Sequence, residues 1–297
     1  MASTTAELAG FMARVQECNA HPSELREFVP FTVGGAAAGL LRPTFASLLA
    51  DTFPAVFSRD GAAVALSPAL ATPKARTDAV AACMLRLRED GTIRGWRDEL
   101  FPVANAFDEE PLFLLERACA PHFGIKAYGV HVNCFCRSAD GSVELWVARR
   151  SRTKPTWPLL LDHMVAGGLG HGLSPSDNVV KECAEEANVP ESLASRAQPA
   201  GVVSYTAVVN EGVKRDVLFC YDLEVPCDFT PTNNDGEVEE FMRWPLHRVA
   251  ETVRTSQDYK PNCCIVIIDF LIRHGYLRPE SKGYLALVQA CRAGDIS

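Results

Sequence analysis

A glycine-rich loop runs into a helix in the stretch Gly167-Gly-Leu-Gly-His-Gly-Leu-Ser-Pro-Ser-Asp-Asn-Val-Val-Lys-Glu-Cys-Ala-Glu-Glu-Ala-Asn-Val189. Ser174 is a suitable N-cap, and Pro175 falls at the first helical position, where its missing N–H costs nothing. Asn188 tolerates the left-handed conformation that ends a helix, and Pro190 prevents continuation. The stretch therefore predicts a helix from Pro175 to about Asn188.

Three carboxylates of this helix can share one side. Glu182, Glu185 and Glu186 stand at positions i, i+3 and i+4, and Lys181 can pair with Glu185 four residues later. Carboxylates held close together repel one another, and a hard cation such as Mg²⁺, which takes oxygen ligands, removes that repulsion. The alternative interpretation is a solvated acidic face. The glycine loop at a fixed distance, together with the family resemblance given next, favours a metal site over this alternative.

These residues resemble the signature of the Nudix hydrolases, which is Gly, five residues, Glu, seven residues and Arg-Glu-apolar-x-Glu-Glu-x-Gly-apolar. Gly167 matches the first Gly, and Glu182-Cys-Ala-Glu-Glu186 matches the core. Three positions differ, because Leu173, Lys181 and Asn188 stand where the family has Glu, Arg and Gly. The carboxylates of the core are complete, so the resemblance implies an intact metal site with different support of the loop.

For a Nudix enzyme this match implies a particular chemistry. Mg²⁺, with Mn²⁺ as an alternative, is expected on the substrate diphosphate, held by Glu182, Glu185, Glu186 and the backbone carbonyls near Gly167 and Gly168. The metal activates a water that attacks phosphorus. The expected acceptor of the proton from that water is Glu185 or Glu186.

A narrower resemblance covers nearly the whole chain. It is to the Nudix subfamily related to thiamin pyrophosphokinase, found alone or fused to that kinase; no kinase domain is recognised here. Members are implicated in hydrolysing thiamin diphosphate and its oxo and oxy analogues to monophosphates. The matching segments include Gly95-Trp-Arg-Asp-Glu99, Tyr128-Gly-Val-His-Val-Asn133, Leu145-Trp-Val-Ala-Arg-Arg150 and Leu161-Asp-His-Met-Val-Ala-Gly-Gly168.

Two other functions stay open. The chain could be a broader Nudix pyrophosphatase for ADP-ribose, NADH or nucleoside diphosphates, which the signature does not exclude. Leu173 could instead mark a non-catalytic module that binds a ligand or a protein partner.

A second acidic group is Asp235-Gly-Glu-Val-Glu-Glu240. In a strand that starts near Glu237, Glu237 and Glu239 point to the same side. In related Nudix enzymes a later carboxylate reaches the metals or acts as the base. The hypothesis is that Glu237 binds metal or that Glu239 is catalytic, partly replacing the Glu missing at position 173. The alternative is an edge strand kept soluble by charge.

An anionic substrate needs local positive charge, because the net charge of the chain is −8. The dense basic run is Arg149-Arg-Ser-Arg-Thr-Lys154, and Arg152 and Lys154 lie closest to the glycine loop in the sequence. They are the candidates for phosphate contact, with a solvated hairpin end as the alternative. An aromatic wall for the organic part of the substrate is expected from Trp157, Tyr205 or Trp96, with the alternative that each is a core residue.

Composition fits a globular protein of two domains. The chain has 297 residues, 47% hydrophobic and 22% charged. The strongly apolar run Cys263–Ile268 is too short to span a bilayer, and the acidic net charge argues against a nucleic-acid surface. Eleven irregularly spaced cysteines suggest reduced thiols. The start lacks an apolar signal core, so we expect a cytoplasmic monomer or homodimer with a small-molecule diphosphate substrate; an organellar location stays open.

The expected fold is an N-terminal α+β domain over residues 1–125 and a C-terminal Nudix α/β/α sandwich with a mixed sheet over residues 126–297. Helices are predicted over residues 5–18, 42–50, 75–89, 111–120, 245–255, 262–274 and 284–293, and strands over 29–33, 63–66, 129–136, 142–148, 162–166, 201–209, 217–224 and 238–244.

Overall fold

A computed structural model describes residues 4–295 of the chain. Its largest unit is a seven-stranded mixed sheet in the order β11-β12-β7-β8-β13, with β10 paired to β7 and β9 paired to β8. The β7–β12 pair is parallel and the other pairs are antiparallel. The strands are β7 (Lys126–Arg137), β8 (Val143–Arg150), β9 (Leu161–His163), β10 (Val165–Gly168), β11 (Gln198–Val208), β12 (Val213–Glu224) and β13 (Val238–Pro245).

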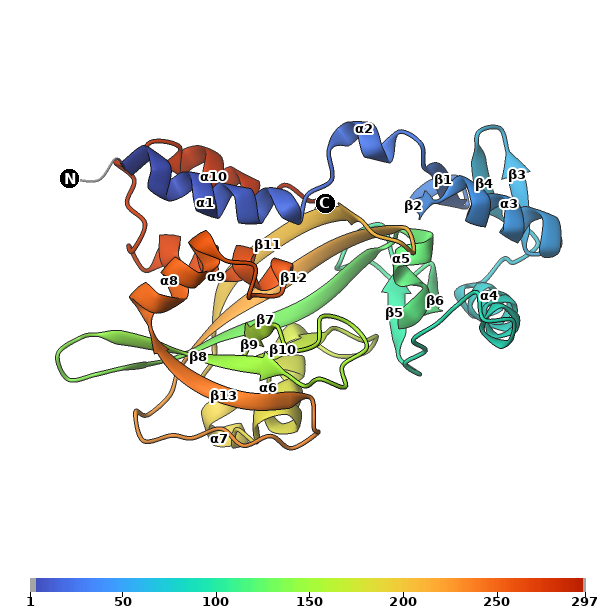
Figure 1. The fold of residues 1–297 in the computed structure, drawn as a ribbon. Coiled ribbons are helices and arrows are strands. Elements are labelled where there is room, and N and C mark those ends of the chain that lie inside the picture. The colour runs from blue at the N-terminus through green and yellow to red at the C-terminus, as the bar shows by residue number, and fades with distance from the viewer. Residues whose placement is uncertain (1–3, 296–297) are drawn as a thin grey trace.

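Helices cover both faces of this sheet (Figure 1). Alternate residues of β7 point to opposite faces, so Val130 and Val132 pack with α6 while Phe135 packs with α9. The predicted mixed-sheet α/β/α sandwich is confirmed. Its helices are α1 (Thr4–Glu17), α8 (Leu246–Thr255), α9 (Pro261–Arg273) and α10 (Tyr284–Ala290) on one face, and α6 (Pro175–Ala187) and α7 (Glu191–Ala194) on the other.

The N-terminal α+β region has its own core, in which Phe31, Phe57, Phe113 and Phe123 pack ring against ring. Its four-stranded sheet has the order β2-β1-β4-β3, and β5 pairs with β6. The elements are α2 (Pro22–Leu25), β1 (Val29–Val33), β2 (Ala36–Leu41), α3 (Pro43–Thr52), β3 (Phe57–Asp60), β4 (Ala63–Leu66), α4 (Pro73–Glu89), β5 (Leu100–Val103), β6 (Phe113–Glu116), the 3₁₀ turn η1 (Arg117–Cys119) and α5 (Ala120–Phe123).

Helix α1 packs outside this N-terminal core. Its residues Leu8, Phe11 and Val15 join the core that α8, α9 and α10 form on the large sheet. Helix α1 therefore packs with the C-terminal sandwich although it belongs to the first part of the sequence. The division of the chain at residue 125 stays a prediction.

Helix α6 forms as its local sequence predicts. The Ser174 hydroxyl accepts the Asp177 N–H at 3.1 Å, and Asn188 ends the helix with φ 52°. The Lys181 ammonium pairs with the Glu185 carboxylate at 2.7 Å. Within residues 4–295, no helix is both long enough and apolar enough to cross a bilayer.

Two secondary-structure predictions were wrong in form. The helix expected over 111–120 is instead β6, η1 and α5, because Phe113 and Leu115 alternate inward and pair with β5. The single strand expected over 162–166 is two short strands, β9 and β10, separated at Met164. This break moves the chain from pairing with β8 to pairing with β7, and so brings the glycine loop against α6.

Candidate active site

The three carboxylates of α6 have different surroundings. Glu186 lines a cavity of about 20 Å³, which is room for a water or an ion. The Glu182 side chain is 13% exposed and packs on the glycine loop. The Glu185 side chain is 52% exposed and pairs with Lys181. The helix therefore directs Glu186 into the site and Glu182 beside it, whereas Glu185 stays at the surface.

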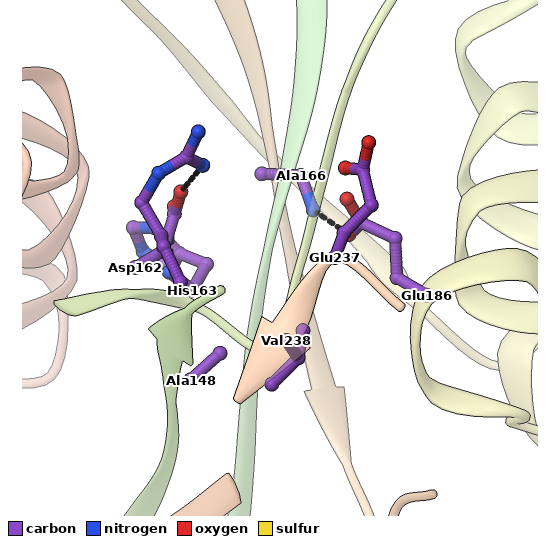
Figure 2. Close-up of a pocket in the computed structure, with 8 residues that line it drawn as sticks. Ala148, Asp162, His163, Ala166, Glu186, Glu237 and Val238 are labelled. Atoms are coloured by element: carbon purple, nitrogen blue, oxygen red, sulfur yellow. Dashed lines mark hydrogen bonds and ion pairs between the residues drawn. The ribbon is translucent and has the colours of Figure 1, made fainter. Parts of the chain in front are cut away.

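Glu186 is held near the start of β10. Its Oε2 accepts the Ala166 N–H at 2.8 Å (Figure 2). Burial raises the pKa of Glu186 well above the usual range, and the charges of Glu182 and Glu237 raise it further, while the Ala166 hydrogen bond lowers it. Burial likewise raises the pKa of Glu182. A bound cation would reverse this unfavourable electrostatic environment.

Two more carboxylates from the β12–β13 connection complete a group around Glu186. Ligand oxygens of Glu186, Asp235 and Glu237 all lie within 4.8 Å of one another. Figure 2 shows the Glu186 and Glu237 side chains pointing toward the same space. Carboxylate oxygens are the ligands that Mg²⁺ prefers, and Mn²⁺ accepts the same set. The donor set therefore fits a hard divalent cation, and the assignment of Glu186 and Glu237 as metal ligands stays a prediction.

Asp235 is a candidate ligand that the sequence interpretation did not include. Its Oδ1 accepts the Glu237 N–H at 2.8 Å, so a tight turn through Gly236 sets the two carboxylates side by side. The Asp-Gly-Glu sequence carried this signal, since aspartate commonly accepts the N–H two residues on in such a turn.

The backbone oxygen that fits the metal belongs to Ala166 rather than to either glycine. Leu169 donates its N–H to the Tyr128 carbonyl, and orientation alternates along an antiparallel strand, so Gly167 directs its carbonyl toward β7. The Gly168 carbonyl already accepts the Asn178 amide at 3.0 Å. The Ala166 carbonyl shares the side of its own N–H, which holds Glu186.

The predicted glycine at 167 is required for packing. A Cβ there would lie 2.1 Å from Cδ of Glu182 and 2.4 Å from its Oε1. Such distances are far below van der Waals contact, so a larger residue here would require the end of the Glu182 side chain to move off the strand. Gly167 therefore serves the carboxylate cluster by leaving room for it.

The predicted phosphate contacts Arg152 and Lys154 pair with the predicted acids of β13. Arg152 contacts Glu239 at 3.0 Å, and Lys154 contacts Glu237. The hydrogen bond from Arg152 lowers the pKa of Glu239, which lies outside the carboxylate group at the cavity. Lys154 is thus brought to the site, whereas Arg152 and Glu239 form an ion pair next to it.

The three aromatic residues considered as substrate contacts differ in exposure and in their place in the fold. Trp157 is 49% exposed in the loop before β9, and its carbonyl accepts the Arg150 Nε–H at 2.9 Å. Tyr205 does not reach the site: it is 4% exposed in the core beneath α9 and donates its hydroxyl to Asp216, so its prediction as a substrate contact is wrong. Trp96 donates to Asp98 at 2.9 Å within the N-terminal region.

The far wall of the cavity is a buried polar network. Arg150 donates to Asp162 at 2.6 Å, and Cys263 donates to the same carboxylate at 2.8 Å. His163 contacts the His131 ring at 3.1 Å, and burial lowers the pKa of His163 to about 4. The neutral imidazoles and the paired carboxylate thus have hydrogen-bond partners, as buried polar groups require. The bond to Asp162 fixes Arg150 at the start of the loop that carries Trp157.

Metal binding should therefore be linked to pH through Glu186. Between the ordinary carboxyl pKa and its raised value, the folded protein holds a proton that the unfolded chain releases. The free energy of unfolding of the metal-free protein should fall as pH rises through that window. Metal binds the ionised carboxylate, so affinity for Mn²⁺ should rise through the same window. Mn²⁺ at about a hundred times its Kd should add ~2.7 kcal/mol to the free energy of unfolding.

Titration calorimetry with Mn²⁺ at several pH values between about 5 and 8 measures this linkage. Glu240→Gln is the control, because Glu240 pairs with Arg149 at the far side of β13 and should leave the affinity unchanged. An affinity for Mn²⁺ that does not vary with pH would contradict the assignment of Glu186.

Comparisons with known proteins agree with this geometry. Residues 127–261 match the NUDIX domain, and residues 10–127 match a domain of unknown function (DUF4743). Nudix hydrolase 24, chloroplastic, from Arabidopsis thaliana is 46% identical over 294 residues, covering 99% of this chain and 80% of that protein. Nudix hydrolase 20, chloroplastic, from the same plant is 45% identical over 303 residues, with the same shares covered.

Among solved structures, the NUDIX domain of Shewanella oneidensis NrtR complexed with ADP ribose is 16% identical, with a TM-score of 0.41, over 51% of this chain and 90% of that chain. The relatives that match along almost the whole sequence establish the family. This chain belongs to the Nudix hydrolases, enzymes that act on pyrophosphate bonds and generally use divalent metal ions.

Proposed function

We propose that this protein is a Mg²⁺-dependent pyrophosphohydrolase that cleaves the diphosphate of thiamin diphosphate, or of its oxo and oxy analogues, to the monophosphate and phosphate. The observation that carries the reaction is the group of Glu186, Asp235 and Glu237, whose ligand oxygens lie within 4.8 Å of one another. The thiamin part rests on the resemblance of the segments from Tyr128 to Gly168 to the thiamin-pyrophosphokinase-related subfamily.

The acidic residues of the site have separate roles in the proposed reaction. Glu186, Asp235, Glu237 and the Ala166 carbonyl would hold the cation, and Glu182 would supply further negative charge beside it. When bound, the cation neutralises charge on the phosphoryl oxygens and lowers the pKa of a water. Of the two residues expected to take the proton from that water, Glu186 is favoured over Glu185, because Glu186 lines the cavity.

The organic end of the substrate is assigned to the Trp157 loop. The Arg150 guanidinium donates to the Thr156 and Trp157 carbonyls, both at 2.9 Å, and holds Trp157 with φ 53°. A non-glycine residue kept in this region of backbone space is costly and is found where the surroundings fix it. An exposed indole presented in this way can stack on a cationic heterocycle.

The test is release of phosphate and monophosphate with Mg²⁺ present, from thiamin diphosphate, oxothiamin diphosphate, oxythiamin diphosphate and ADP-ribose. Preferential turnover of a thiamin-type diphosphate supports the whole proposal. Turnover of ADP-ribose alone keeps the Nudix reaction and rejects the thiamin substrate. Tight Mg²⁺-dependent binding without turnover of any compound would make the chain a binding module, with Leu173 as the residue to replace by Glu.

We keep the cytoplasm as the proposed location and a monomer or homodimer as the proposed assembly. The chloroplast named for both Arabidopsis relatives makes an organelle the competing location. Microscopy of a fluorescent C-terminal fusion decides between the two.

A further inference from the structure

An arginine of the N-terminal region lies against the glycine loop of the Nudix domain. A Cβ on Gly168 would be 3.0 Å from Cζ of Arg117 and 3.2 Å from its Nη1. The neighbouring Gly167 is in the same kind of contact with Glu182. The guanidinium and the carboxyl therefore contact consecutive residues of β10, whose Cβ positions lie on opposite faces of the strand. Burial raises the pKa of Glu182, and the positive charge of Arg117 is among the effects that lower it.

The backbone around Arg117 is firmly fixed. The Arg117 N–H donates to the Glu99 carbonyl at 2.8 Å. The carboxylate of Glu116 accepts the N–H groups of Arg97 and Ala118, at 2.8 and 3.1 Å, from within a buried site. The guanidinium lies 5.5 Å from the centre of the Phe101 ring. Arg117 is thus presented from a rigid turn, as a binding residue must be to gain affinity without a large ordering cost.

The N-terminal region also holds the loop itself. The His171 N–H donates to the Leu100 carbonyl of β5 at 2.9 Å. A Cβ on Gly170 would be 3.1 Å from Oε1 of Glu99. Residues of the Gly95-Trp-Arg-Asp-Glu99 segment and of β5 therefore line the outer side of the glycine loop, and strand β5 contacts β7 of the large sheet.

The basic side chains Lys154, Lys181 and Arg150 near the site are paired with groups of the site itself. Lys154 pairs with Glu237, and Lys181 pairs with Glu182 and Glu185. Arg150 is held by the buried Asp162 and by two backbone carbonyls. Arg117 differs, because its partner Glu99 comes from the N-terminal region and is not a carboxylate of the site; the two side chains are 42% and 32% exposed. An exposed ion pair of this kind is weak and yields readily to a stronger anion.

We propose that Arg117 leaves Glu99 to bind the substrate diphosphate, so that the N-terminal region completes the Nudix active site. A guanidinium matches phosphoryl oxygens with paired N–H donors, which a lysine cannot reproduce. In this role Glu99 holds the arginine ready and competes with the substrate for it. The inference rests on the proposed hydrolysis of a diphosphate, and binding is therefore measured separately from turnover.

The experiment is titration calorimetry with imidodiphosphate, a non-hydrolysable diphosphate, on the full chain in the presence of Mg²⁺. Arg117→Ala should weaken the Kd for imidodiphosphate about tenfold or more, and Arg117→Lys should recover only part of it. Affinity for Mg²⁺ alone should not fall. The matched control is Arg59→Ala, which removes another exposed arginine paired with a carboxylate, Asp51, in the N-terminal region, and should change nothing.

The variant Glu99→Gln distinguishes two roles of Arg117, which are binding of the diphosphate and neutralisation of the Glu99 charge. If Arg117 binds the diphosphate, Glu99→Gln should keep or improve the affinity, and Arg117→Ala combined with Glu99→Gln should stay weak. Recovery of wild-type affinity in the double variant would overturn the proposal, since Arg117 would then serve only to neutralise Glu99. An unchanged Kd in Arg117→Ala would also overturn it. Failure of the proposed function would appear differently, as absence of turnover in a wild-type protein that still binds imidodiphosphate.

Discussion

Glu186→Gln should abolish turnover while making the metal-free protein more stable at neutral pH. The amide can still accept the Ala166 N–H, but it cannot ionise, and so it removes a partly buried charge that Glu182 and Glu237 repel. Loss of a charged metal ligand should remove several kcal/mol of transition-state stabilisation, so kcat should fall about a thousandfold or more. Phosphate release with thiamin-type diphosphates measures the activity, and urea unfolding without metal measures the stability.

Glu240→Gln is again the control, since it removes a carboxylate of β13 that pairs with Arg149 and not with the cavity. It should leave kcat and the free energy of unfolding near their wild-type values. Wild-type turnover in Glu186→Gln would remove Glu186 from the reaction. Lower metal-free stability would show that the charge of Glu186 is better compensated than its surroundings indicate.

Gly167→Ala should cost both activity and stability. The added methyl would overlap the Glu182 carboxyl, whose Cδ lies 2.1 Å from the position of that Cβ. Because the end of the Glu182 side chain can move, the cost in stability should be about 1 kcal/mol, the low end of the range for overpacking. Displacement of a site group by about 1 Å can lower the rate about a hundredfold. Thermal unfolding and kcat with saturating Mg²⁺ measure the two effects.

A double variant, Gly167→Ala with Glu182→Ala, tests the cause. Removing the Glu182 carboxyl relieves the overlap, so stability should return toward that of Glu182→Ala alone while activity stays low. If the double variant is as unstable as Gly167→Ala, the methyl clashes elsewhere and the contact with Glu182 is not the reason for the glycine.

The local parts of the site were readable from the sequence. Ser174, Pro175 and Asn188 are residues whose own backbone and side-chain chemistry begins and ends a helix, and α6 has those limits. The spacing of Glu182, Glu185 and Glu186 gave three acids near one another. Strand alternation and apolar content gave the sandwich, because they depend on periods of two and about four residues.

The sequence alone left the choice among those acids undecided. A spacing of three and four residues puts Glu185 and Glu186 near the same side, and only the packing of α6 on β10 directs Glu186 to Ala166 and leaves Glu185 with Lys181. Tyr205 is a similar case. An aromatic residue on a strand fits either a core or a ligand wall, and the pairing of β11 with β12 sets it beside Asp216 in the core.

By itself, the sequence determined the helix, its glycine loop, the acidic residues available for metal and the family, since all of these depend on neighbouring residues or on a linear pattern. Tertiary structure alone decided which oxygens converge, namely Glu186 with Asp235 and Glu237, 49 and 51 positions further along the chain. It also brought Arg117 to Gly168. Such contacts depend on how distant strands and helices pack, and their energy comes from the folded core rather than from any local propensity.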